Sequence, residues 1–162
     1  MVPDDAALSF DDYSALGEFR FRIRCFLHFS ELAARQEGLE PQQHQLLLAI
    51  RSLERADPPT IGDLADHLLI RHHSAVGLID RMEERGLVNR VRSPRDRRQV
   101  RVRLTARGEE KLNRLSVIHR TELRNSGPAL VEALDGLLRR LNEPKQQPDK
   151  EQDVPTPRES YS

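Results

Sequence analysis

The sequence predicts a mainly helical fold with one small β-hairpin. Its 162 residues are the length of a single domain. Charged residues make up 32% of the chain and aromatic residues only 4%, a balance that favours solvated helices over a β-sandwich or barrel. Apolar residues follow the helical period along most of the chain, and two short segments, 87–92 and 99–104, have a period of two, with Val100, Val102 and Leu104 alternating with arginines in the second.

Both ends of the chain are expected to be disordered, at 1–12 and 143–162, which leaves a body of 13–142. The first twelve residues hold four acids, and the last twenty hold four of the ten prolines with almost nothing to bury. No apolar run approaches the roughly 18 residues of a membrane span, and the acidic N-terminus is unlike a signal peptide. We therefore expect a cytoplasmic protein that contacts no membrane.

The first clear helix covers about 19–35 and holds four of the five phenylalanines. Its apolar positions occupy more than one side, which indicates burial against the body on one side and against a second subunit on the other. A second helix is expected to start at Pro41, a favourable first helical position, and to stop ahead of Pro58.

The next segment predicts two short helices across a tight turn. Thr60 and Asp63 have the spacing of a capping box, ahead of apolar residues with helical spacing over 61–68. A second helix starts near His72 and is expected to end at Gly86, a good left-handed cap residue. This arrangement is a candidate helix-turn-helix.

The two alternating segments that follow predict a hairpin, because Pro94 and Asp96 favour a turn between them. Thr105 is then expected to cap a long helix. Gly127 and Pro128 are expected to break that helix, and a last helix is expected over 129–141.

The chain has 26 basic and 26 acidic residues, but the charge is unevenly distributed. From Arg71 to Arg103 there are ten arginines, no lysine and four acids. Arginine forks onto phosphates and guanine edges, so this segment is typical of a duplex DNA footprint. A solvated basic face is the alternative, and some strand arginines, among Arg90, Arg92, Arg101 and Arg103, are expected only to pair with acids.

The segment TIGDLADHLLIRHHSAVGLIDRMEERGLVNRVRSPRDRRQVRVRLTARGEEKL resembles the winged helix-turn-helix of MarR-type transcriptional regulators. With its flanking helices the resemblance covers about 19–142. It implies a winged helix over about 41–105 and dimerisation helices over about 13–36 and 106–142. It also implies recognition helices in successive major grooves of DNA and wings at minor grooves. Members of this family generally repress transcription and release DNA when a small, often aromatic, ligand or an oxidant acts.

The expected DNA contacts lie at the start of the recognition helix and in the wing. Side chains at the helix N-terminus meet base edges, Gly77 allows close approach, and Arg81 is within reach of a phosphate. By the family pattern, Asp96 holds Arg98 extended for the minor groove. Val76 and Gly77 stand where many relatives have Thr and Arg, and Ser93 replaces an Asp before the proline. The predicted DNA-binding residues are Arg71, His72, His73, Ser74, Gly77, Arg81, Arg95, Asp96, Arg97 and Arg98.

Cys25 is the single cysteine, which excludes a disulfide framework and a Cys-rich zinc site. It lies roughly where the hydroperoxide-sensing branch of the family keeps a reactive thiol, but Phe29 stands where that branch has a Tyr. We favour core packing for Cys25, with oxidant sensing as the alternative. His28 and His44 border the position of a family-type ligand pocket, although an exposed or hydrogen-bonded histidine is the alternative for each.

The chain lacks a Gly-rich phosphate loop, a nucleophile elbow and spaced metal ligands, so we expect no enzyme, cofactor or metal. The expected function is a homodimeric, ligand-responsive repressor that binds a pseudo-palindrome in double-stranded DNA, released by a small aromatic effector. The alternatives are a thiol-based oxidant sensor acting through Cys25 and a winged-helix module that binds another protein instead of DNA.

Overall fold

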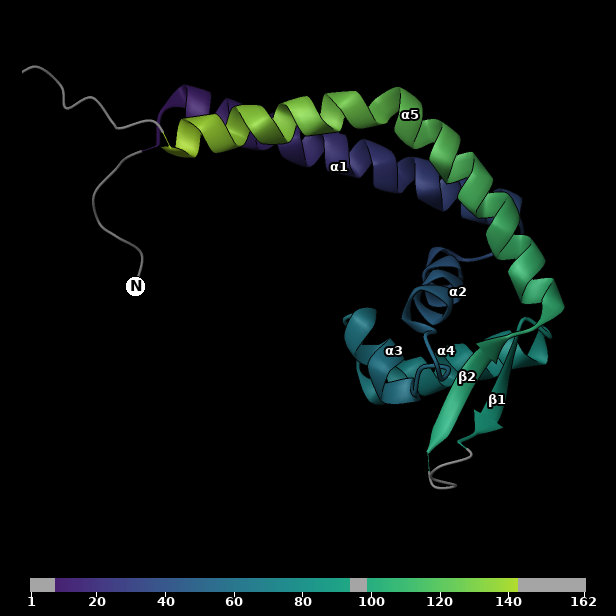
Figure 1. Cartoon of the computed structure of the whole chain (residues 1–162). Coiled ribbons are helices and arrows are strands. Elements are labelled where there is room, and N and C mark those ends of the chain that lie inside the picture. The colour runs from purple at the N-terminus through teal and green to yellow at the C-terminus, as the bar shows by residue number, and fades with distance from the viewer. Residues whose placement is uncertain (1–7, 94–98, 143–162) are drawn as a thin grey trace, which may run out of the picture.

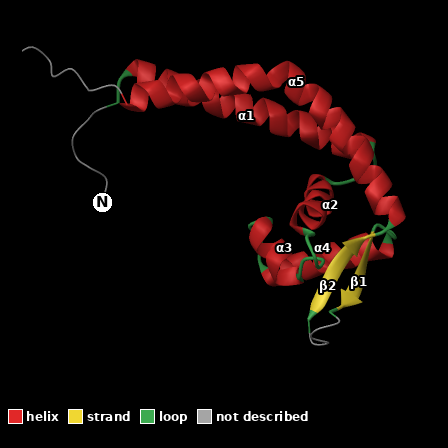
Figure 2. Cartoon of the chain, viewed as in Figure 1, coloured by secondary structure: helices red, strands yellow, loops and turns green. Residues whose placement is uncertain are grey.

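The computed structural model describes residues 8–93 and 99–142 (Figure 1). Within these residues the predicted class, mainly helical with one antiparallel hairpin, is confirmed (Figure 2). The elements in chain order are α1 (Phe10–Gln36), α2 (Pro41–Leu53), α3 (Ile61–His67), α4 (His72–Glu84), β1 (Val88–Arg92), β2 (Val100–Leu104) and α5 (Ala106–Asn142).

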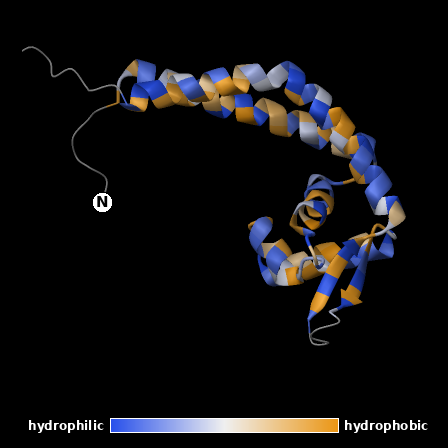
Figure 3. Ribbon diagram, in the orientation of Figure 1, coloured by the Kyte–Doolittle hydropathy of each residue, from blue (hydrophilic) through white to orange (hydrophobic). Residues whose placement is uncertain are grey.

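The elements form a compact body and a long arm. Figure 1 shows α2, α3, α4 and the hairpin gathered in the body, while α1 and α5 lie side by side and antiparallel in the arm that extends from it. Apolar residues recur along both arm helices as well as in the body (Figure 3). No described helix has an apolar stretch long enough to cross a membrane.

The hydrophobic core lies in the body and at the base of the arm. The buried residues of α1 begin only at Ser30, and those of α5 end at Leu115, so the outer part of the arm has no side chain that this chain alone buries. The largest fully buried side chains are Leu39, Leu46, Leu47, Ile50, Leu64, Ile79, Met82, Leu87, Leu115, Val88 and Val102.

Helix α1 begins at Phe10, three residues before the expected boundary. Ser9 and Asp12 form a capping box, in which the Ser9 hydroxyl accepts from the Asp12 N–H at 3.1 Å and Asp12 Oδ2 accepts from the Ser9 N–H at 2.9 Å. These bonds satisfy backbone donors that a helix start otherwise leaves open. Residues 1–7 and 143–162, also expected to be disordered, lie outside the described residues.

The expected break at Gly127 and Pro128 is wrong, because α5 continues through both residues to Asn142. A proline inside a helix removes one hydrogen bond and costs about 3 kcal/mol. Here the carbonyl that loses its donor belongs to Arg124, and both Arg124 and Pro128 are exposed, so water can hydrate it.

The start of α5 is fixed against the hairpin, as the expected cap at Thr105 predicts. The Thr105 hydroxyl accepts from the Gly108 N–H at 3.1 Å and donates to the Gly86 carbonyl at 2.7 Å. A Cβ at Gly108 would lie 2.1 Å from the Leu87 carbonyl oxygen, so only glycine allows this crossing. The base of the arm is therefore held directly on the turn that joins α4 to β1.

Candidate nucleic-acid interface

Helices α3 and α4 form the predicted helix-turn-helix. The Thr60 hydroxyl accepts from the Asp63 N–H at 3.1 Å, and Asp63 Oδ2 accepts from the Thr60 N–H at 2.8 Å. This N–H, and then the Thr60 hydroxyl, lower the pKa of Asp63. Leu69 takes a left-handed conformation, with φ of 54°, and is 93% exposed in the turn between the helices. Gly86 ends the second helix with φ of +67°, as its position predicts.

The first turn of α4 faces solvent. Arg71, at the N-cap, and His72, His73 and Ser74 are all exposed. The opposite side of the helix packs into the core through Ala75, Leu78, Ile79 and Met82. The helix therefore presents the four predicted side chains together with the free backbone N–H groups of its N-terminus.

Further along α4, Gly77 and Arg81 follow His73 at four-residue intervals, which places the three on one side of the helix. Gly77 is partly buried and Arg81 is exposed. A Cβ at Gly77 would lie 3.6 Å from Arg81 Nη1, an ordinary contact. The structure thus brings all the predicted recognition-helix residues onto one end and one side of α4.

The wing is confirmed as an antiparallel hairpin whose register runs from Val88 opposite Leu104 to Arg92 opposite Val100. The Ser93 N–H donates to the Gln99 carbonyl at 3.2 Å and extends the ladder toward the tip. The predicted wing contacts Arg95, Asp96, Arg97 and Arg98 lie outside the described residues.

One edge of the hairpin is held by the loop ahead of α3. The Val102 N–H donates to the Pro59 carbonyl at 2.9 Å, and Arg101 Nη1 donates to the Pro58 carbonyl at 2.5 Å. Thr60 also pairs with Arg101 as an isolated bridge. Arg101 is therefore a structural residue, which its place in the basic segment did not indicate.

The other edge of the hairpin is held by α4. Arg90 Nη2 lies 2.6 Å from Asp80 Oδ1, and Arg90 Nη1 lies 2.6 Å from Glu83 Oε2. Glu83 Oε1 accepts from the Arg90 backbone N–H at 3.0 Å. This N–H, and then the guanidinium, lower the pKa of Glu83. The expectation that some strand arginines pair with acids is confirmed for Arg90.

Arg85 is a further basic residue with a structural role. Its guanidinium donates to Gln43 Oε1 and to the Gly38 carbonyl, both at 2.6 Å. By contrast, the side chains of Arg71, Arg81 and Arg92 make no hydrogen bond or ion pair with any other described residue. Within the described part of the basic segment from Arg71 to Arg103, the arginines without a partner therefore lie at both ends of the exposed face of α4 and on β1.

A cavity of about 460 Å³ lies between the arm and α2. His44 is 3% exposed and its Nδ1 has no hydrogen-bond partner among the described residues. Its ring centroid lies 4.8 Å from that of His119. Burial, and secondarily the neighbouring His119, lower the pKa of His44 to about 4, so His44 is neutral at pH 7. The cavity is lined by Phe26, His44, Leu48, Ser116, His119, Arg120, Leu123 and Arg124.

His119 is oriented by two polar contacts. Its Nδ1 lies 2.7 Å from the Leu115 carbonyl oxygen, which can only accept, so this nitrogen donates. Its Nε2 lies 2.7 Å from the Ser30 hydroxyl. Sequence reasoning missed His119, because nothing near it in the chain indicates that α1 and α2 meet it.

The predicted site residues of α1 lie elsewhere. His28 is exposed and does not line this cavity, whereas His44 does. The expectation that Cys25 packs into the core is wrong for the chain by itself, because its thiol-bearing side chain is exposed. Helix α5 covers only one side of α1, so much of the apolar arc that suggested burial stays open.

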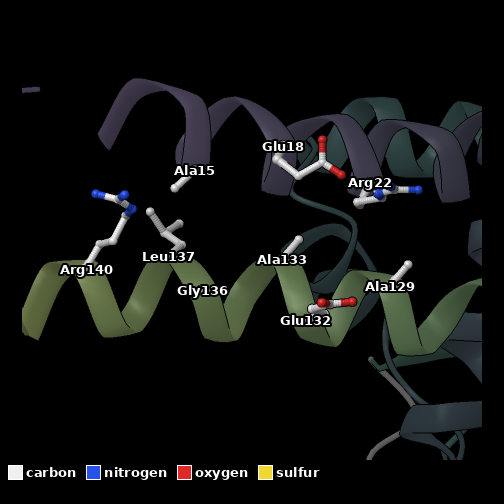
Figure 4. Close-up of a pocket in the computed structure, with 9 residues that line it drawn as sticks. All are labelled: Ala15, Glu18, Arg22, Ala129, Glu132, Ala133, Gly136, Leu137 and Arg140. Atoms are coloured by element: carbon white, nitrogen blue, oxygen red, sulfur yellow. Dashed lines mark hydrogen bonds and ion pairs between the residues drawn. The ribbon is translucent and has the colours of Figure 1, made fainter. Parts of the chain in front are cut away.

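A second hollow, of about 450 Å³, separates the outer parts of α1 and α5. Figure 4 shows that Ala129, Ala133 and Gly136 of α5 face α1 with little side chain to fill the gap. On α1, Glu18 pairs with Arg22 at 2.6 Å beside it. The arm is thus incompletely packed by its own two helices.

Comparisons with known proteins find similarity both in sequence and in fold. A sequence model described as the MarR family matches residues 37–99. The transcriptional activatory protein BadR of Rhodopseudomonas palustris is 40% identical over 76 residues, which are 47% of this chain and 43% of BadR. The chain therefore spans less than half the length of this curated relative.

Two solved structures share the fold. AbsC, a MarR family transcriptional regulator from Streptomyces coelicolor, has a TM-score of 0.68 and 24% identity over 85% of this chain and 93% of AbsC. Bordetella bronchiseptica BpsR, whose DNA binding is regulated by 6-hydroxynicotinic acid, has a TM-score of 0.57 and 22% identity over 76% of this chain and 95% of BpsR.

An exposed second helix of a helix-turn-helix beside an antiparallel hairpin defines the winged helix-turn-helix class. The family match and the structural neighbours go one step further. Residues 37–99 match the MarR family, and the chain shares the fold of solved MarR family regulators such as AbsC.

Proposed function

We propose that this protein is a homodimeric regulator that binds double-stranded DNA with α4 in the major groove. The observation that carries the proposal is the first turn of α4, where Arg71, His72, His73 and Ser74 are all exposed to solvent. A helix N-terminus attracts phosphate, and side chains from its first turn reach base edges.

The residues divide into two roles. His72 and His73 contact base edges and set sequence preference, while Arg81 contacts a phosphate. In the wing, Arg98 enters the minor groove with Asp96 as its support, and Arg95 and Arg97 bind the backbone. This division predicts that His73→Ala changes sequence preference more than general affinity, and that Arg98→Ala lowers affinity and the salt dependence on every duplex.

Selection of bound duplexes from a random library at near-physiological salt tests the proposal. We expect an enriched inverted repeat with half-sites about 10 bp apart, the spacing of a symmetric dimer. If a folded, dimeric protein enriches no duplex, a winged helix that serves a protein partner replaces this proposal. Equal effects of His73→Ala and Arg98→Ala on all duplexes would contradict the assigned roles.

We further propose that a small aromatic acid acts at the cavity beside His44. The walls include Phe26 and His119, whose centroids lie 6.0 Å apart, and Arg120 and Arg124 supply positive charge. His44 also lines this cavity, and its Nδ1 has no hydrogen-bond partner among the described residues. BpsR supports this class, because its DNA binding responds to 6-hydroxynicotinic acid.

Titration calorimetry with 6-hydroxynicotinate as the probe tests this effector class. We expect the wild-type chain to bind this probe. The double variant Arg120→Ala/Arg124→Ala should lose binding, whereas Arg20→Ala, at an exposed site away from the cavity, should retain it. Binding that survives loss of both cavity arginines would place the ligand elsewhere.

Oxidation of Cys25, whose exposure admits peroxide, is the alternative trigger. In that case Cys25→Ser would abolish a peroxide response and leave DNA affinity intact.

We propose repression as the direction of control, because a dimer lying across a promoter blocks transcription by occupancy alone. A reporter gene downstream of the enriched duplex measures it. Higher expression after deletion of the regulator is expected, and lower expression would assign this chain the activating role that the name of BadR records for that relative.

A further inference from the structure

The hairpin and the recognition helix are separate elements, and DNA binding as proposed above needs both at a fixed angle. Their apolar contact lies near the base of the hairpin, where Leu87 and Val88 are buried with Met82. Beyond Val88 the strand leads away toward the tip, and Val91 and Arg92 are partly or fully exposed. Something other than the core must therefore hold the outer half of β1 against α4.

Arg90 supplies that connection. It stands in the middle of β1 and bridges two carboxylates one helical turn apart on α4, Asp80 and Glu83, both at 2.6 Å. The Arg90 N–H donates to Glu83 as well, so both the backbone and the side chain of Arg90 attach β1 to α4. The Arg90 side chain is 26% exposed, against 52% for Asp80 and 39% for Glu83, so the guanidinium is the better shielded part of this charge-assisted bridge.

We propose that Arg90 is a positioning residue that sets the angle between α4 and the wing and does not itself contact DNA. The β2 edge of the hairpin is already held by Pro58 and Pro59, so Arg90 completes the attachment on the β1 edge. A DNA site that α4 contacts in the major groove and the wing contacts in the minor groove requires these two elements at a fixed distance from one another. Loosening Arg90 therefore lowers binding to the matched site while leaving backbone binding in place.

The inference rests on the proposed DNA-binding function. Removing the two acids that bind Arg90 tests it, because a positioning role and simple electrostatics predict opposite changes in affinity for the enriched duplex. Asp80→Asn/Glu83→Gln frees Arg90 and adds two positive charges per subunit. Electrostatics alone predicts tighter binding to every duplex. A positioning role predicts binding to the enriched duplex at least about 10-fold weaker, with binding to a mixed-sequence duplex unchanged or tighter. The matched control, Asp66→Asn/Glu84→Gln, adds the same charge at exposed acids that Arg90 does not touch.

Fluorescence anisotropy on both duplexes, with circular dichroism to verify the fold, is the measurement. The inference is overturned if Asp80→Asn/Glu83→Gln binds the enriched duplex as tightly as the control double variant. Should that variant fail to fold, Arg90→Lys replaces it, since an ammonium keeps the charge without forking onto two carboxylates. Wild-type affinity in Arg90→Lys would then overturn the inference. A wild-type chain that enriches no duplex overturns the proposed function itself.

Discussion

At the scale of single residues, His44 combines burial with a nitrogen that has no described partner. A buried cation costs far more than a buried neutral ring, so the folded chain resists protonation here. His119 adds to this resistance, since its ring is 4.8 Å away and two imidazolium ions would repel one another. The same environment that suits an aromatic ligand therefore makes stability depend on pH.

The sign of that dependence follows from the pKa of His44, about 4 in the folded chain against 6.5 for an ordinary histidine. Between these values the unfolded chain binds the proton more readily, so the free energy of unfolding falls as pH drops from 7 to 4. A shift of this size corresponds to at most about 3 kcal/mol. Below pH 4 the contribution of His44 levels off.

Urea unfolding at pH 7 and pH 5 measures this contribution. His44→Gln, which cannot titrate, is expected to flatten the pH dependence over this range. His28→Gln removes an exposed histidine from α1 and serves as the control, with the wild-type dependence retained. A profile for His44→Gln as steep as that of the wild type would assign the pH dependence to other groups.

At the scale of elements, local signals were sufficient where the physics is local. The capping box of Thr60 and Asp63, the left-handed cap at Gly86 and the cap at Thr105 were all predictable, because each depends on neighbours within a few residues. The alternating segments likewise predicted the hairpin, whose register the structure adds.

Elements were mispredicted where distant contacts decide the outcome. Pro128 is a helix breaker by propensity, yet α5 continues through it to Asn142 as part of the arm. The bridge from Arg90 to Asp80 and Glu83 joins a strand to a helix, and sequence spacing alone could not distinguish it from a DNA contact. For the same reason His119 was missed and Cys25 was assigned to a core that its chain does not build.

At the scale of the whole molecule, the arm carries more apolar surface than a lone chain should expose. Phe10 is 83%, Tyr13 60%, Val131 66% and Leu141 69% exposed, and no residue of the outer arm is buried. Contiguous apolar patches of this kind mark interaction sites. The hollow between α1 and α5 in Figure 4 adds space that a second copy of the arm could fill.

We therefore expect the arms of two subunits to pair and form the dimer interface, with one DNA-binding body at each end of the paired arms. Because the interface of a two-fold dimer contains each substitution twice, Val131→Glu should place two unpaired carboxylates in an apolar contact and raise the dimer dissociation constant by about 100-fold or more. Asn125→Glu is the matched control, since Asn125 is an exposed residue of α5 that the helical repeat places about 120° around the helix from Val131. Sedimentation velocity measures both variants against the wild type. A wild-type chain that sediments as an 18.6 kDa monomer at micromolar concentration, or a Val131→Glu variant that dimerises like the control, would place the interface elsewhere.

Where the dimer is lost but the body stays folded, affinity for a single half-site should persist while affinity for the inverted repeat falls, because the two recognition helices then bind independently.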